Sequence, residues 1–147
     1  MGNCIKEVVQ KYVIKYNTRD PFKLAKLLGI EVQLGTPGCA GCYMFLKNHR
    51  YIFLDQNLEG TELLQIMAHE LGHAILHKKQ NCYFIRNKTL LLISKTEQEA
   101  NLFAAELLID ADIVLEHPEY TTSQLSRLLG YEERLVELWM QNQKNIY

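Results

Sequence analysis

The pentad His69-Glu70-Leu71-Gly72-His73 constrains this chain more than any other feature, because an HExxH pattern acquires its chemistry only on a helix. Residues four apart lie one turn apart on the same helix face. His69 and His73 can therefore each place an imidazole nitrogen about 2.0–2.1 Å from one Zn²⁺. Glu70 projects beside this pair, where it can reach a metal-bound water as general base. The alternative interpretation is a pair of solvated histidines on an amphipathic helix.

The residues around the pentad have the periodicity of a core helix, which we expect from about Thr61 to Lys78. At about 100° per residue, apolar side chains gather on one side of this helix. Glu62 and Gln65 share the opposite side with the two histidines. The apolar side carries Leu63, Leu64, Met67, Leu71, Ala74 and Ile75. The helix is therefore predicted to bury its apolar back and to present the histidines on its polar front.

A hydrolytic zinc site needs a third protein ligand and one open position, and Glu97 and Glu99 are the main candidates. On a helix these two side chains point about 200° apart, so only one of them can face the histidines. The Glu97 face also carries Ala104 and lies near Ala100, and these small side chains allow another helix to approach closely. The Glu99 face is mixed and more exposed, with Leu102, Phe103 and Glu106. We therefore predict Glu97 as the third ligand.

Asn101 and His77 are expected near the metal ligands without binding the metal themselves. Asn101 lies one turn beyond Glu97, where it can accept a hydrogen bond from the outer nitrogen of a zinc-bound histidine. His77 continues the histidine row, but it lies about 12 Å from His69 along the helix axis. The two cannot share one ion with His73 between them, so we expect His77 to pack or hydrogen-bond at the helix end.

The helix that carries Glu97, expected over about 97–108, has two possible N-terminal capping boxes. Thr96 as N-cap with Glu99 three residues later would give Glu99 a purely structural role. Ser94 and Glu97 could form the same motif, so the capping pattern leaves both assignments open.

The remaining elements predict an α+β order, with a small antiparallel or mixed sheet packed on a helical bundle that contains the buried HExxH helix. Asp20-Pro21 opens a helix that closes at Gly29, and Thr121 and Gln124 form a capping box in a later one. A tight turn at Asn48-His49 is expected between two strands. Two or three short helices are expected at the end of the chain. The other expected elements are a helix at 4–16, strands at 30–34, 42–47 and 50–55, and a possible strand at 89–93 in an otherwise irregular segment.

Length and charge exclude several classes of protein. The 147 residues suit one domain, 1–147, and 48% apolar residues suffice for a core. A net charge of −1 gives no electrostatic footprint for direct nucleic-acid binding. The longest apolar runs are a few residues, whereas a membrane span needs roughly 20. Cys39 and Cys42 form a CxxC that we interpret as a turn with two free thiols, because the second pair of a structural zinc site is missing.

The segments HELGHAILH and EQEANLFAAELL resemble the ImmA/IrrE family of gluzincin-like zinc metallopeptidases, over at least His69 to Leu108. The second motif of that family falls on Glu97 and Asn101, which agrees with the geometric choice. The resemblance implies a zincin-like fold and a cytoplasmic, Zn²⁺-dependent protease, often encoded on phages and other mobile elements. Its partner would be a helix-turn-helix repressor. Ile109-Asp110 departs from the Met-Pro of many relatives.

The hypothesis that follows is metal-assisted hydrolysis of a specific regulatory protein. His69, His73 and Glu97 would bind Zn²⁺, Glu70 would be the general base and Asn101 would support a ligand from outside. A second oxyanion donor could be Tyr43, His49, Tyr51 or Tyr83, and the strand at 50–55 is expected to pair with an extended substrate. One alternative is an anti-repressor that binds zinc but acts without cleavage. Another is a structural zinc domain with a fourth ligand, such as Asp112 or a cysteine.

Overall fold

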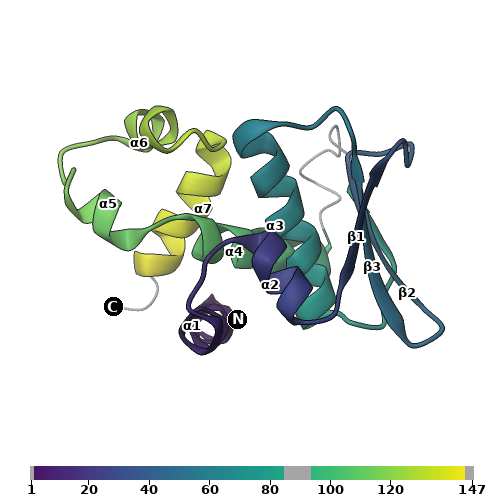
Figure 1. Cartoon of the computed structure of the whole chain (residues 1–147). Coiled ribbons are helices and arrows are strands. Elements are labelled where there is room, and N and C mark those ends of the chain that lie inside the picture. Colours follow the sequence, from purple (N-terminus) through teal and green to yellow (C-terminus); the bar gives the residue numbers. More distant parts are fainter. Residues whose placement is uncertain (1, 85–93, 145–147) are drawn as a thin grey trace.

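The structure is a computed structural model that describes residues 2–84 and 94–144. It confirms the α+β class: a small sheet lies on one side of the molecule and most helices on the other (Figure 1). The predicted strand at 89–93 falls outside the described residues. In chain order the elements are α1 (Gly2–Tyr16), α2 (Pro21–Leu27), β1 (Glu31–Gly35), β2 (Gly41–Leu46), β3 (His49–Asp55), α3 (Gly60–Leu76), β4 (Cys82–Phe84), α4 (Lys95–Leu108), α5 (Ala111–Leu115), α6 (Thr122–Leu129) and α7 (Glu133–Lys144).

The sheet is mixed, with the strand order β1-β3-β2-β4. β1 runs parallel to β3, whereas β2 pairs antiparallel with both β3 and β4. β3 therefore has a neighbour on each side. The prediction that the 50–55 strand pairs with an extended substrate is wrong for this sheet, because no edge of β3 is open to a peptide.

Two local details of the sheet also differ from the sequence-based expectation. The β2–β3 turn is formed by Lys47 and Asn48, both with positive φ (48° and 63°), and His49 already belongs to β3. Positive φ at both central residues is the geometry of the two-residue hairpin turns that match strand twist. The short strand β4 lies in a segment predicted to be irregular, because three residues carry too little alternation to be recognised.

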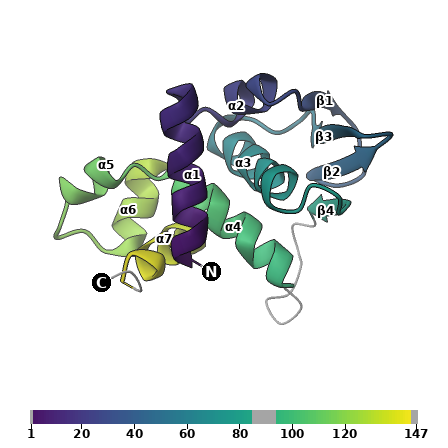
Figure 2. The ribbon, with the colours of Figure 1, turned by 90° about the horizontal axis from the view of Figure 1, so that it is seen from below.

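Helix α3 lies between the sheet and the other long helices (Figures 1 and 2). Its apolar side chains belong to the hydrophobic core. Met67, Leu71 and Ala74 are completely buried, as are Ile52 and Leu54 of β3. The two histidines of the predicted polar front are buried too, at most 2% exposed, whereas Glu62 at the start of the helix is exposed. The histidines are buried because α4 packs against α3 and covers them.

A glycine in the HExxH motif permits the close approach of α4. A Cβ atom built on Gly72 would lie 3.2 Å from both the Cα and the carbonyl oxygen of Ala100, and 3.1 Å from the Cβ of Phe103. Backbone atoms of a packed helix cannot yield by rotating a side chain. The distance between α3 and α4 therefore depends on the absence of a side chain at Gly72 and on the small side chain of Ala100.

The far side of α4 is fixed by a buried polar network. Glu106, which is 6% exposed, accepts hydrogen bonds from Asn142 Nδ2 (2.7 Å) and Gln143 Nε2 (2.8 Å) of α7. Lys6 of α1 donates in turn to Gln143 Oε1 at 2.6 Å. Arg19 donates to the carbonyl oxygens of Glu106 and Leu107, both at 3.1 Å. These bonds connect α1, α4 and α7. They fix α4, which carries Glu97, on the side away from α3.

We predict that Gly72→Ala destabilises the protein by about 1–2 kcal/mol. Overpacking a tight contact costs roughly 1–3 kcal/mol, and the better helix propensity of alanine returns at most about 1 kcal/mol. Urea unfolding measures this change. Gly35→Ala is the matched control, because a Cβ there meets nothing within 4 Å. Equal stability of Gly72→Ala and the wild type would contradict the proposed basis of the α3–α4 contact.

Candidate metal centre

Two imidazoles from α3 and one carboxylate from α4 converge at the α3–α4 contact. The Nε2 atom of His69 lies 2.9 Å from Glu97 Oε2, and the Nε2 atom of His73 lies 3.0 Å from Glu97 Oε1. The two Nε2 atoms are 3.2 Å apart. One possible ligand atom from each residue lies within 4.8 Å of the others. This is the only group of three such residues in the described part of the chain.

The start of α4 places Glu97 in this position. Ser94 is the N-cap, and its hydroxyl accepts a hydrogen bond from the backbone N–H of Glu97 at 3.3 Å. The helix therefore begins at Lys95, two residues earlier than expected, and the Thr96–Glu99 capping box is wrong. Thr96 lies inside the first turn, so its hydroxyl is not at the N-cap position.

The two candidate carboxylates reach different histidines. Glu97 contacts His69 and His73, whereas Glu99 Oε2 lies 3.3 Å from His77 Nε2. Burial acts to raise the pKa of Glu97, but hydrogen bonds and charge interactions with His69 and His73 outweigh it and hold this pKa well below its usual range. Glu97 is therefore a negatively charged carboxylate at neutral pH, and this is the form that binds a cation through oxygen.

Asn101 completes the environment of His69. Its Oδ1 atom lies 2.8 Å from His69 Nδ1, on the side of the ring away from Glu97. With a metal bound at Nε2, Nδ1 would carry the proton and donate it to the Asn101 oxygen. This bond would fix both the tautomer and the orientation of the ring.

Glu70 is the one buried group of the site whose hydrogen bonds are missing. It is 0% exposed, and neither of its carboxylate oxygens has a hydrogen-bond partner among the described residues. Burial and then the charge of Glu97 raise its pKa well above the ordinary value. A cation with a bound water beside this carboxylate would supply both a counter-charge and a proton donor. Two imidazole nitrogens and a carboxylate are also the ligand set of many hydrolytic zinc sites, so the residues present fit this metal.

The first residue of β2, Gly41, packs against Glu70. A Cβ built on Gly41 would lie 3.3 Å from Glu70 Cγ and 2.8 Å from Ile66 Cγ2. Cys39 and Cys42 flank this glycine as free thiols. Burial raises the pKa of both, to about 12 for Cys42, so they are protonated at neutral pH. Neither is part of the cluster, although the CxxC contains Gly41, whose backbone lies against Glu70.

Three of the four predicted oxyanion donors lie away from the cluster. Tyr43 is completely buried, and its hydroxyl donates to the carbonyl of Lys78, just beyond the end of α3. His49 and Tyr51 alternate with the buried Ile52 along β3, so they lie on the face of the sheet away from α3. Tyr83 lies in β4. The structure therefore brings none of Tyr43, His49 and Tyr51 to the cluster. Asp112, the possible fourth ligand, is exposed on α5 and is not in the cluster either.

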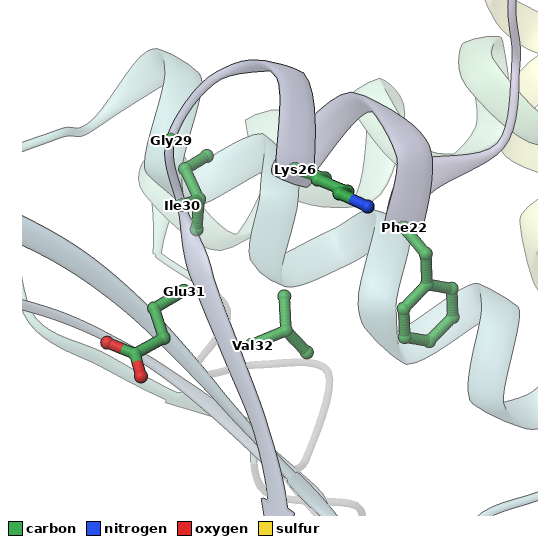
Figure 3. A pocket seen from close by; sticks show the side chains of 6 residues that line it. All are labelled: Phe22, Lys26, Gly29, Ile30, Glu31 and Val32. Carbon is green, nitrogen blue, oxygen red and sulfur yellow. The ribbon is translucent and has the colours of Figure 1, made fainter.

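A pocket at the β1 edge of the sheet is separate from this cluster. It has a volume of about 360 Å³ and opens between α2 and the start of β1 (Figure 3). Its lining residues are Phe22, Lys26, Gly29, Ile30, Glu31 and Val32, none of which belongs to the metal centre.

Fold and site together define a class: an α+β, zincin-like protein in which an HExxH helix meets a glutamate from a following helix. The chain belongs to the ImmA/IrrE family, because residues 25–135 match the family described as IrrE N-terminal-like domain. This confirms the predicted family and supports a metallopeptidase. Among the described residues, no helix has the length and hydropathy to cross a membrane.

Two relatives carry informative names. The chain is 35% identical over 138 residues to "Uncharacterized immunity region protein 2" of Bacillus phage phi105, which covers 91% of this chain and 87% of that protein. It is 31% identical over 108 residues to "Metallopeptidase ImmA" of Bacillus subtilis (strain 168), which covers 71% of this chain and 63% of that protein.

We predict that Glu70→Gln stabilises the chelator-treated protein at pH 7–8 by about 1–3 kcal/mol, because the neutral amide avoids the cost of burying a carboxyl whose pKa is raised. A carboxyl whose pKa is raised in the folded state stabilises the fold below its unfolded pKa and loses that contribution as pH rises. The difference in the free energy of unfolding between Glu70→Gln and the wild type should therefore become smaller toward pH 4. Urea unfolding across this pH range measures it, and a gap that widens toward acid pH would contradict the assignment.

Proposed function

We propose that this protein is a zinc-dependent peptidase with His69, His73 and Glu97 as metal ligands. The observation that carries the proposal is the convergence of Glu97 on both imidazoles next to a buried, unpartnered carboxylate, Glu70. Bound Zn²⁺ would act as a Lewis acid and lower the pKa of a coordinated water. Glu70 would take the proton of the attacking water and pass it to the leaving amine. Asn101 would keep His69 in the required tautomer.

An extended substrate would need a free sheet edge, and β4 is the outer strand on the side of the site. β4 pairs with residues 41–43 of β2, where Gly41 contacts Glu70. We infer that the scissile segment adds to this edge, because main-chain pairing there would bring its carbonyl toward the cluster.

For the substrate, we propose a regulatory protein of a phage or mobile element, in particular a helix-turn-helix repressor. The name of the phi105 relative refers to an immunity region, and the name of the B. subtilis relative to a metallopeptidase. The alternative is a zinc-binding anti-repressor that acts by binding alone, and the same family membership supports it.

The ligand assignment predicts different outcomes for the two glutamates. Glu97→Ala removes a ligand and should weaken Zn²⁺ binding by more than about 100-fold, whereas Glu99→Gln keeps an acceptor for His77 and should stay within about 10-fold of the wild type. Competition with a chromophoric chelator measures both affinities. The reverse order would assign the third ligand to Glu99.

Cleavage is tested with a repressor encoded beside this gene. The zinc-loaded protein should produce repressor fragments, and chelation should abolish them. Glu70→Gln should retain the metal and lower cleavage by about 10²–10⁴-fold, the usual contribution of a general base. Glu62→Gln, on the exposed first turn of the same helix, is the matched control. An intact repressor that loses DNA binding with both the wild type and Glu70→Gln would support the anti-repressor instead.

A further inference from the structure

A second His–Glu pair lies directly behind the metal cluster. His77 Nδ1 lies 3.4 Å from His73 Nδ1, and His77 Nε2 lies 3.3 Å from Glu99 Oε2. The side chains of His77 and Glu99 are only 9% and 19% exposed. The result is a continuous line of polar contacts from the cluster through His73 and His77 to Glu99.

The direction of each hydrogen bond in this line follows from the cluster. His73 directs Nε2 at Glu97, so a metal would be bound through this atom and Nδ1 would carry the proton. His73 Nδ1–H then donates to Nδ1 of His77, which must be the unprotonated nitrogen of that ring. The remaining proton of His77 is on Nε2, which donates to the Glu99 carboxylate. A single set of tautomers therefore satisfies every bond.

Helix termination does not require this arrangement of side chains. The C-cap bond of α3 is made by the backbone N–H of His77 to the carbonyl of His73 at 2.8 Å, so the imidazole of His77 takes no part in it. Glu99 is likewise not needed to cap α4, because Ser94 caps that helix through Glu97 N–H. Local secondary structure thus leaves the contact between these two side chains unexplained.

We propose that His77 and Glu99 are positioning residues that hold His73 in its metal-binding tautomer, as Asn101 holds His69. This inference rests on the proposed function, because it needs His73 to be a metal ligand. Each histidine of the HExxH motif then has its own outer acceptor. Asn101 serves His69 directly, and Glu99 serves His73 through the ring of His77.

The test is a double-mutant cycle on metal affinity. His77→Phe keeps a ring of similar size and should weaken Zn²⁺ binding by about 10–100-fold, the typical effect of losing an outer hydrogen bond of a ligand histidine. Glu99→Leu should weaken it by a similar factor. The double variant should be no weaker than His77→Phe alone, because both substitutions interrupt one line. His77→Gln, which can accept from His73 and donate to Glu99, should restore most of the affinity.

A spectroscopic measurement separates positioning from general loss of structure. In the zinc-loaded protein, NMR should show a slowly exchanging Nδ1–H proton on His73 that disappears in His77→Phe and is retained in His77→Gln. The Tm of the chelator-treated variants shows whether the fold is intact. His117→Phe with Glu119→Leu, on surface residues outside the cluster, is the matched control pair.

The outcomes distinguish this inference from the proposed function. A wild-type protein that binds no Zn²⁺ tightly would overturn both. A wild type that binds Zn²⁺, with His77→Phe and Glu99→Leu equal to it in affinity, would overturn the positioning role alone. Additive losses in the double variant would also overturn it, because they would show that the two residues act independently.

Discussion

The contact between α3 and α4 is the constraint on which the rest of this structure depends. Gly72 and Ala100 allow the two backbones to approach so closely that a Glu97 side chain from one helix spans two imidazoles on the other. The same contact buries both histidines. The geometry of the candidate site and the packing of the core are therefore one feature, and a change in helix separation would alter both.

This contact also explains which parts of the molecule could be predicted from the sequence. Periodicity and capping residues give most helices and three of the strands, because these signals are local. The choice of Glu97 over Glu99 as the residue facing the histidines also follows from a local argument, since helix geometry separates the two side chains by about 200°. Glu97 lies with both histidines, as the small residues on its face suggest.

The errors arise where non-local pairing decides the outcome. β3 lies inside the sheet because β1 pairs with the edge of β3 that β2 leaves open. No pattern within residues 50–55 predicts this pairing with β1. β4 exists because β2 offers a free edge, although three residues alone do not specify a strand. His77 hydrogen-bonds at the end of α3, as expected, but the sequence did not predict its partner Glu99. Its contact with Glu99 depends on how far α4 extends along α3, which the sequence does not specify.

The polar groups at the α3–α4 contact differ in whether they have hydrogen-bond partners. His69, His73 and Glu97 contact one another, and the outer nitrogens of the two rings lie against Asn101 and His77. Glu70, in the middle of the same motif, is completely buried without a hydrogen-bond partner among the described residues. An apolar side chain there would make the fold more stable, because the carboxylate is desolvated without compensation. A buried carboxyl group without a partner, within electrostatic reach of Glu97, is consistent with a group that binds between them, since that group would supply the missing interaction.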